Sequence, residues 1–297
     1  MTKRALLMVN RYARKGQKSL AQAVDALNEL DFELITVPIK SCQELAESVH
    51  KYGPHVDTII VGGGDGTLNS VVDSLLEQQL PLGILPLGTA NDLARTLSIP
   101  LSIPEACKVI AQGQTKLIDL GWVNGKYFFN VASMGLSVDI TEKLTKGAKR
   151  RWGILAYGFT ALQVLSQTRS FSAEIRLNGE NFPVKTIQIA VGNGRYYGGG
   201  MTIAQEATID DQKLDLYSLE LKSWWQIFPL LWSFPQGQHG LLPWVRTLRG
   251  EEIEINTRKS LSINTDGELT ASTPAKFRVI PKALSVFVPN IAEAATD

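Results

Sequence analysis

Cysteine is scarce in this sequence, which limits the cross-links and sites that the chain can build. Only Cys42 and Cys107 occur among the 297 residues. Both lie in stretches with helical periodicity, and their spacing fits neither a disulfide framework nor a zinc site. We therefore expect two reduced thiols with a structural role.

A strong net charge and long apolar runs are also missing. The 30 basic and 29 acidic side chains leave a formal net charge of +1, which gives no general attraction to a polyanion, so we expect no nucleic-acid partner. The N-terminal apolar run is too short for a signal peptide, and the longest runs, near 154–165 and 224–234, fall short of the roughly 20 residues that span a bilayer. We expect a cytoplasmic protein whose contact with the inner face of the membrane is peripheral.

The residues that are present indicate a folded protein with two domains. Hydrophobic residues make up 44% of the chain and charged residues 20%, which is typical of globular proteins. A chain of this length exceeds one ordinary core.

Up to about residue 118, apolar strand-like runs alternate with amphipathic helical patterns. This alternation predicts βαβ units and a parallel sheet, with ligands at the carboxyl ends of its strands. The runs ALLMVN and TIIV are continuously apolar, as expected of strands buried on both faces. We predict an α/β domain over residues 1–122.

Beyond residue 119 the pattern changes to short strands separated by turn signals. Asn124-Gly125 and Asn178-Gly179 predict tight hairpins, because both central residues of a type I′ turn need positive φ. One helical pattern, over 151–167, interrupts the strands. We predict a β-rich domain over residues 123–288, an antiparallel sandwich or an open barrel, followed by a tail over 289–297 for which a return to the first domain is one option.

A glycine-rich loop, GGGDGTLN over residues 62–69, follows the strand TIIV and precedes a helical pattern. Such glycines let backbone N–H groups approach an anion, and the helix N-terminus adds a favourable dipole, which indicates a phosphate site. The loop has neither the Lys-Ser/Thr ending of a P-loop nor GxGxxG spacing. Asp65 beside phosphates implies Mg²⁺. The structural alternative is a turn with Asp65 or Thr67 as a helix cap.

A second loop, LPLGTANDLAR over residues 85–95, follows the next strand-like run, LGIL. Two such loops at neighbouring strand ends predict a cleft lined with hydrogen-bond donors. This second loop favours the phosphate site over the plain turn.

Together, GGGDGTLN and LPLGTANDLAR resemble the catalytic domain shared by diacylglycerol kinases, sphingosine and ceramide kinases and bacterial lipid kinases. The resemblance continues at 118–137, 191–201, 207–216 and 264–269, so it covers nearly the whole chain. It implies an α/β nucleotide-binding lobe like that of NAD kinases and phosphofructokinases, joined to a β-rich lobe. It also implies ATP and Mg²⁺ as cofactors, with ATP and a lipid meeting in the cleft.

The resemblance implies a set of nucleotide-binding residues, most of them in the two loops. They are Gly63, Gly64, Asp65, Gly66, Thr67 and Asn69 in the first loop, Thr89 and Asn91 in the second, and Asn10 and Thr36 near the ends of earlier strands. Two positions depart from the family pattern. Arg11 stands where the family usually has Pro, and Ser70 stands where it usually has Glu.

Asp266 and Glu268, in the segment TDGE, are candidates for the proton acceptor that a hydroxyl nucleophile needs. The resemblance implies that this segment faces Asp65 across the cleft, which makes these three the predicted catalytic carboxylates. The alternative is an Asp-Gly hairpin turn with Glu268 in solvent. Either residue can be the base; Glu268 is slightly favoured because its side chain is longer, while Asp266 has a second use in fixing the turn.

Residues 210–213, DDQK, have two interpretations. The first is a plain turn. The second, implied by the resemblance to bacterial lipid kinases, is a structural Mg²⁺ site formed by the Asp211 side chain and the main-chain oxygens of Thr208 and Lys213.

A basic cluster precedes the predicted helix over 151–167; it consists of Lys146, Lys149, Arg150 and Arg151. Basic side chains near an anionic leaflet contribute on the order of 1 kcal/mol each, so the cluster is a candidate membrane contact. A core-facing helix with a solvated basic start is the alternative. The Trp-containing segment 224–232 is a second candidate for the membrane interface.

The predicted function is an ATP- and Mg²⁺-dependent lipid kinase that acts on diacylglycerol, phosphatidylglycerol or a related lipid. Two alternatives stay open. One is a kinase of the NAD-kinase type with a soluble substrate, because GGDGT is shared with that group. The other is a nucleotide-binding regulator that has lost catalysis, which only Ser70 suggests. The sequence gives no oligomeric state.

Overall fold

A computed structural model describes residues 3–10, 16–39, 41–136, 138, 169–197, 201–202, 207–221, 223, 226 and 242–290. These residues form two compact units. The first contains the described residues up to Leu120 and those from Ile280 onward, and the second contains those between Gly121 and Val279. The predicted helix over 151–167, the basic cluster at 146–151 and the Trp residues of 224–232 lie outside the described residues.

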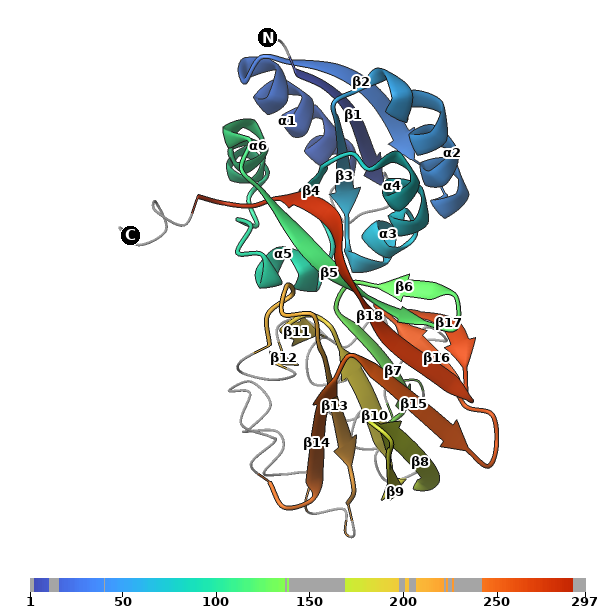
Figure 1. Cartoon of the computed structure of the whole chain (residues 1–297). Helices are drawn as coiled ribbons and strands as arrows, with labels where there is room; N and C mark the ends of the chain where they lie inside the picture. The colour runs from blue at the N-terminus through green and yellow to red at the C-terminus, as the bar shows by residue number, and fades with distance from the viewer. Residues whose placement is uncertain are drawn as a thin grey trace, which may run out of the picture. The chain divides into compact units, whose positions relative to one another are not determined.

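The first unit is a parallel sheet with the strand order β2-β1-β3-β4, extended by the end of β18 (Figure 1). Because β1 lies between β2 and β3, the connections leave it in opposite directions, which is the arrangement of a doubly wound sheet. The predicted α/β fold is therefore confirmed. The strands are β1 (Lys3–Asn10), β2 (Phe32–Ile39), β3 (Thr58–Gly63), β4 (Leu82–Pro86) and β18 (Ala275–Phe287).

Helices cover both faces of this sheet. Helix α1 packs against α6, and α2 packs against α4; Figure 1 shows the two pairs on opposite sides of the strands. The helical pattern that follows the glycine-rich loop forms two helices rather than one, because the Ser70 hydroxyl donates to the Thr67 carbonyl and the turn at Ser70 and Val71 breaks the regular ladder. The helices are α1 (Gly16–Glu29), α2 (Cys42–Tyr52), α3 (Asp65–Asn69), α4 (Val72–Gln78), α5 (Asp92–Thr96) and α6 (Ile103–Gln112), with a 3₁₀ turn η1 (Gly53–His55).

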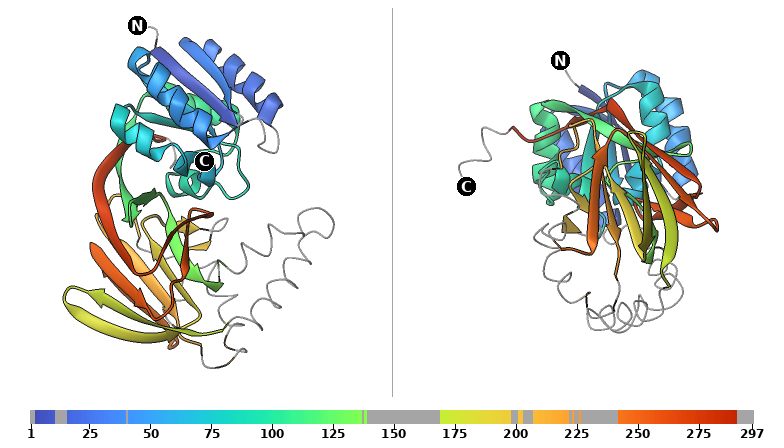
Figure 2. Two further views of the ribbon diagram at one scale, coloured as in Figure 1. Left: turned by 90° about the vertical axis from the view of Figure 1, so that its right-hand side faces the viewer. Right: turned by 60° about the horizontal axis from the view of Figure 1, so that its bottom comes forward.

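The second unit contains two antiparallel sheets that enclose one apolar core. One sheet has the order β14-β13-β10-β7-β16-β17, and the other contains β15, β8, β9 and the start of β18. Alternate residues of strands from both sheets, such as Ile189 and Ile253, are fully buried in the core. The predicted antiparallel β-rich lobe is confirmed. Figure 2 shows the same strands in two further views.

The strands of the second unit are short, and tight turns join several of them. Asn124, Gly125, Asn178 and Gly179 all have positive φ, as the predicted type I′ turns require. The strands are β5 (Thr115–Val123), which begins in the first unit, β6 (Lys126–Phe128), β7 (Val131–Gly135), β8 (Phe171–Leu177), β9 (Glu180–Thr186), β10 (Gln188–Gly192), β11 (Tyr196–Tyr197), β12 (Met201–Thr202), β13 (Leu214–Leu219), β14 (Val245–Gly250), β15 (Glu252–Thr257), β16 (Ser262–Thr265) and β17 (Glu268–Ser272).

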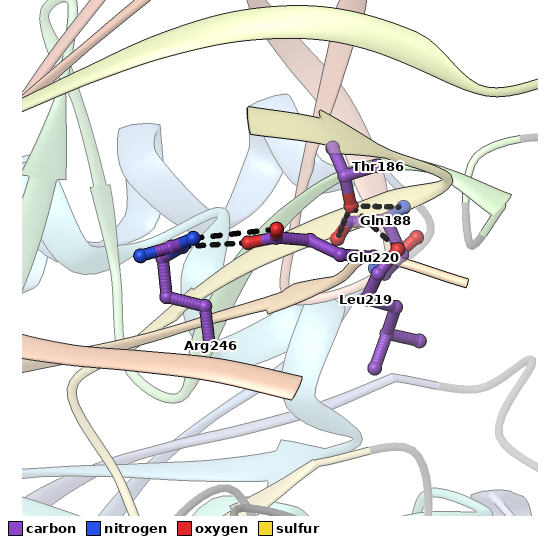
Figure 3. Close-up of polar contacts among 5 residues, drawn as sticks. All are labelled: Thr186, Gln188, Leu219, Glu220 and Arg246. Atoms are coloured by element: carbon purple, nitrogen blue, oxygen red, sulfur yellow. Dashed lines mark hydrogen bonds and ion pairs between the residues drawn. The ribbon is translucent and has the colours of Figure 1, made fainter. Parts of the chain in front are cut away.

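Polar contacts connect the strands β10, β13 and β14 of the six-stranded sheet, as Figure 3 shows. The buried Thr186 hydroxyl lies 2.8 Å from the carbonyl oxygens of Gln188 and Leu219. Beside it, the Arg246 Nε donates to Glu220 over 2.6 Å, which ties β14 to the end of β13. A cation at Arg246 thus compensates the partly buried carboxylate of Glu220.

Strand β18 is shared between the two units. Its first half pairs antiparallel with β15, and Val286 near its end pairs parallel with Leu82 of β4. The Val288 N–H then donates to the Gln114 carbonyl over 3.0 Å. Residues from Ile280 onward therefore group with the first unit, although the sequence division placed residues up to 288 in the second.

Candidate active site residues

The glycine-rich loop leaves the carboxyl end of β3 and opens α3. Gly64 is the N-cap of α3 and no side chain caps this helix, so the alternative in which Asp65 or Thr67 caps the following helix is wrong. A Cβ on Gly63 would lie 2.5 Å from the Thr67 side chain, so only glycine lets the chain turn this tightly. The Thr67 hydroxyl accepts a hydrogen bond from Asn10 Nδ2 over 3.4 Å.

The two loops pack against each other at their glycines. The Leu87 N–H donates to the Gly63 carbonyl over 2.9 Å, which continues the pairing of β3 with β4 into the loops. A Cβ on Gly88 would lie 2.5 Å from the Gly64 Cα, and a Cβ on Gly64 would lie 3.0 Å from the Gly88 Cα. Side chains at either position would push the two backbones apart.

Asp65 connects the loops through its side chain. Its Oδ1 accepts the Leu93 N–H over 3.0 Å, so this carboxylate caps α5 rather than α3. No hydrogen bond to its Oδ2 occurs among the described residues. Local sequence pattern could not predict this contact, because the two residues are 28 positions apart.

The other loop residues lie close to this connection. Asn91 has φ of 52°, and its Oδ1 accepts the Gly88 N–H over 2.8 Å, which shapes the second loop from within. Thr89 is exposed, whereas Gly66, Thr67 and Asn69 are half-buried. The structure therefore brings both loops, Asn10 and their polar side chains to one edge of the sheet.

Thr36 is farther from this edge than the sequence suggested. It lies at the fifth position of β2 and pairs with Leu7, while Asn10 pairs with Ile39 at the end of both strands. Three residues of strand correspond to about 10 Å. Thr36 is exposed on an edge strand, and nothing in the fold of the first unit ties its side chain to the two loops.

A cavity of about 1040 Å³ lies beside the second loop, between α1 and the segment that leads into α6. Gly88 and Asn91 line it, together with α1 residues such as Lys18 and Gln22. None of the residues of the first loop contributes to it. The helical pattern of α1 gave no reason to assign these polar residues to a cavity, because they follow the ordinary spacing of a solvated helix face.

In the second unit, Asp266 is a structural carboxylate. It is 9% exposed and accepts three backbone N–H groups, from Phe129, Asn130 and Val131, over 2.6, 3.0 and 3.1 Å. Together with Gly267 it forms the turn between β16 and β17, both with positive φ. The predicted Asp-Gly hairpin therefore exists, and Asp266 holds it to the strand β7.

Glu268 differs from Asp266 in its exposure and in its hydrogen bonds, and both matter for proton transfer. It begins β17 immediately after the turn and is exposed. No hydrogen bond or ion pair engages its carboxylate among the described residues. An uncommitted carboxylate can accept a proton, whereas one already saturated by backbone donors cannot do so without losing them.

Asp211 forms a closed turn. Its Oδ1 accepts the Lys213 N–H and its Oδ2 accepts the Thr208 N–H, over 3.0 and 3.2 Å. Arg249 pairs with both Asp211 and Asp215, and burial raises the pKa of Asp215 while Arg249 opposes that rise. The plain turn is thus present, with a guanidinium supplying the positive charge beside the carboxylates.

The donors available to a metal are few in the described part of the chain. That part contains no group of three or more His, Cys, Asp and Glu side chains suited to one ion. Asp65 still fits Mg²⁺, because Mg²⁺ usually takes one or two protein carboxylates and completes its shell with water and phosphate. Asp211 with two carbonyl oxygens also has the right donor type, but there Arg249 already occupies Oδ2.

No helix in the described ranges is long and apolar enough to cross a membrane.

Two family models match this chain. Residues 4–123 match the diacylglycerol kinase catalytic domain, and residues 130–288 match the YegS C-terminal NAD kinase beta sandwich-like domain. Among similar proteins, one from Yersinia enterocolitica assigned as a YegS-like lipid kinase is 36% identical and covers 79% of both chains. A diacylglycerol kinase from Staphylococcus aureus is 28% identical over 98% of this chain and 94% of its own.

The fold gives the same result. A Bacillus anthracis structure assigned as a diacylglycerol kinase superposes with a TM-score of 0.83, at 26% identity and 98% coverage of both chains. The predicted resemblance is therefore confirmed over nearly the whole length. This chain belongs to the family of lipid kinases that join a diacylglycerol kinase catalytic domain to a YegS-type β-sandwich domain, and it is accordingly an enzyme of the phosphotransferase class.

Proposed function

We propose that this protein transfers the γ-phosphate of ATP to a hydroxyl group of a lipid, with diacylglycerol or phosphatidylglycerol as the first acceptors to test. The observation that carries this proposal is the packing of Gly64 on Gly88, which brings two glycine-rich loops and Asp65 to one sheet edge. Backbone N–H groups at such an edge suit phosphate oxygens.

In this proposal the first unit is the nucleotide-binding domain. The phosphates contact Asn10 and the two glycine-rich loops, through residues 63–67, Asn69, Thr89 and Asn91. Thr36 contacts another part of the nucleotide. Mg²⁺ would neutralise charge on the phosphate oxygens and so stabilise ADP as the leaving group. Asp65 suits the role of its protein ligand, since Leu93 fixes the carboxylate through Oδ1 alone.

Glu268 is the proposed proton acceptor for the attacking lipid hydroxyl. Its carboxylate is exposed and uncommitted, and Asp266 holds the turn from which it projects. In this proposal Asp266 positions the turn and Glu268 accepts the proton, because backbone N–H groups already engage both oxygens of Asp266. The second unit then supplies the base and the lipid contacts.

A structural Mg²⁺ at Asp211, with the carbonyl oxygens of Thr208 and Lys213, is a further part of the proposal. Mg²⁺ at Oδ2 of Asp211 would compete with Arg249, because that oxygen already accepts both the guanidinium and the Thr208 N–H. Arg249→Ala should therefore strengthen Mg²⁺ binding at this turn, measured by calorimetry. Absence of Mg²⁺ binding at this turn in both the wild-type protein and that variant would contradict the proposed site.

The decisive experiment incubates the purified protein with radiolabelled ATP, Mg²⁺ and a panel of lipids in mixed micelles, with NAD as a soluble control. Labelled lipid that appears only with intact Glu268 supports the proposal. Labelled NADP instead would assign the protein to the soluble-substrate alternative. ATP binding without transfer to any acceptor would favour the nucleotide-binding regulator.

A further inference from the structure

Asn130 is a buried polar residue without hydrogen bonds for its side chain. The residue is 2% exposed, and neither its Oδ1 nor its Nδ2 has a hydrogen-bond partner among the described residues. A buried amide without partners is costly, because it has lost its contacts with water and gained none in return. Such a group in a native structure requires an explanation, and a missing ligand is one.

The backbone around Asn130 is held by two segments distant in sequence. Its N–H donates to the Asp266 carboxylate over 3.0 Å, and its carbonyl accepts the N–H groups of Asn193 and Gly194 over 2.9 and 3.2 Å. The Asn193 side chain donates to the neighbouring Phe129 carbonyl over 2.8 Å. Hydrogen bonds therefore fix the main chain of Asn130 from both sides, while the donor and acceptor of its side-chain amide are unsatisfied in the described structure.

The hydrogen-bonded backbone of Asn130 also lies next to the turn that carries Glu268. Thr265 pairs with Ala132 in the register of β16 and β7, so the Asp266-Gly267 turn and Asn130 meet at the same end of these strands. A residue that is rigid, polar and unsatisfied beside a proposed base is suited to bind the group on which that base acts.

We propose that Asn130 binds the acceptor lipid through the hydroxyl that receives the phosphate or through the adjoining ester oxygen. The amide offers a donor and an acceptor side by side, which matches a hydroxyl next to an ester carbonyl. This inference rests on the proposed lipid kinase activity and adds a residue to it. The polar glycerol end of the lipid, rather than the ribose of ATP, is the ligand.

The test replaces Asn130 by Leu, which has a similar volume and no polar atoms. If the amide is unsatisfied until lipid binds, Asn130→Leu should keep or raise the thermal midpoint, because an unpaired buried amide has been removed. It should lower kcat/KM for diacylglycerol by about 10- to 100-fold, as expected for one or two lost hydrogen bonds, while the KM for ATP changes by less than about twofold. Calorimetry with dihexanoylglycerol and no nucleotide should show weaker binding.

Ser218 provides a matched control. Its hydroxyl is also fully buried and has no partner within the described ranges, but it lies on β13, which β10 separates from β7. Ser218→Ala should leave the kinetics for both substrates unchanged.

The outcomes separate this inference from the proposed function. Wild-type protein that phosphorylates no lipid contradicts the proposed function. Wild-type lipid phosphorylation with normal diacylglycerol kinetics in Asn130→Leu contradicts the inference alone. A large fall in the thermal midpoint of Asn130→Leu also contradicts it, because the amide would then be satisfied in the free protein. A raised KM for ATP would assign Asn130 to the nucleotide instead.

Discussion

The three candidate carboxylates differ in how many of their oxygens accept hydrogen bonds from the backbone. Asp65 uses one oxygen to cap α5, Asp266 uses both to hold backbone, and Glu268 uses neither within the described structure. Residue type alone does not distinguish these states. The distinction gives three predictions, one for each carboxylate.

Asp65→Asn should abolish phosphoryl transfer while the thermal midpoint stays within a few degrees. The amide keeps an oxygen for the Leu93 N–H but loses the negative charge that suits Mg²⁺. Asp73→Asn, an exposed carboxylate in the first turn of α4, is the matched control. Turnover and thermal unfolding of both variants are the measurements, and near-normal turnover in Asp65→Asn would remove the metal role.

Glu268→Gln should lower kcat by roughly 10² to 10⁴, the usual contribution of a general base, with little change in stability or ATP binding. Glu180 occupies the same position after the Asn178-Gly179 turn, so Glu180→Gln controls for the substitution itself. A kcat above about a tenth of the wild-type value in Glu268→Gln would exclude this carboxylate as the base.

Asp266→Asn should behave differently, since an amide cannot accept all three backbone N–H groups that the carboxylate accepts. We expect a loss of about 2 kcal/mol or more in unfolding free energy, because hydrogen bonds to a charged acceptor are worth more than neutral ones. Urea unfolding measures it. A stable Asp266→Asn variant with low kcat would instead assign proton transfer to Asp266.

At the scale of elements, the contact between the two loops depends on the absence of side chains. Gly88→Ala should weaken ATP binding at least about tenfold, because its Cβ would lie 2.5 Å from the Gly64 backbone. Gly53→Ala is the control, since its Cβ would meet only the flexible end of Gln78. Equal ATP affinity in both variants, measured by calorimetry, would show that the loops tolerate separation.

Helix α6 gives a prediction on pH. Burial raises the pKa of the Cys107 thiol from 9.0 to about 11, so between these values the unfolded chain loses the thiol proton while the folded protein keeps it. The folded state binds more protons there, and its stability must fall as pH rises through this window. Cys107→Ala should reduce that slope in urea unfolding; an unchanged slope would place its cause elsewhere.

At the scale of the whole molecule, activity on a lipid requires access to a surface. We expect the activity to rise with anionic vesicles and to fall with salt, as screening weakens the basic cluster at 146–151. Changing Lys149, Arg150 and Arg151 to Ser should lower vesicle binding and spare short-chain substrate. The charge-matched control replaces three basic residues that are exposed in the second unit, Lys126, Lys185 and Arg258. Equal vesicle binding by the two triple variants would show that the basic cluster faces solvent and does not contact the membrane.

The sequence by itself determined the elements and their class. Continuous apolar runs at β1 and β3 predicted buried parallel strands, and Asn-Gly pairs predicted two hairpins, because strand burial and type I′ turns depend on residues adjacent in the chain. It also placed both glycine-rich loops after strands. Helix α4 was less predictable, since the break at Ser70 depends on a side-chain bond to Thr67.

Only the tertiary structure decided what the polar side chains contact. Asp65 reaches Leu93, Asp266 reaches the backbone before β7, and the Asn130 side chain has no hydrogen-bond partner in the described part of the chain. Local periodicity reports on neighbours within a few positions, whereas these contacts join residues up to 137 positions apart. Their geometry depends on how strands pair and loops pack. For this reason Asp65 caps a helix, Asp266 holds a turn to the backbone, and Glu268 stays uncommitted.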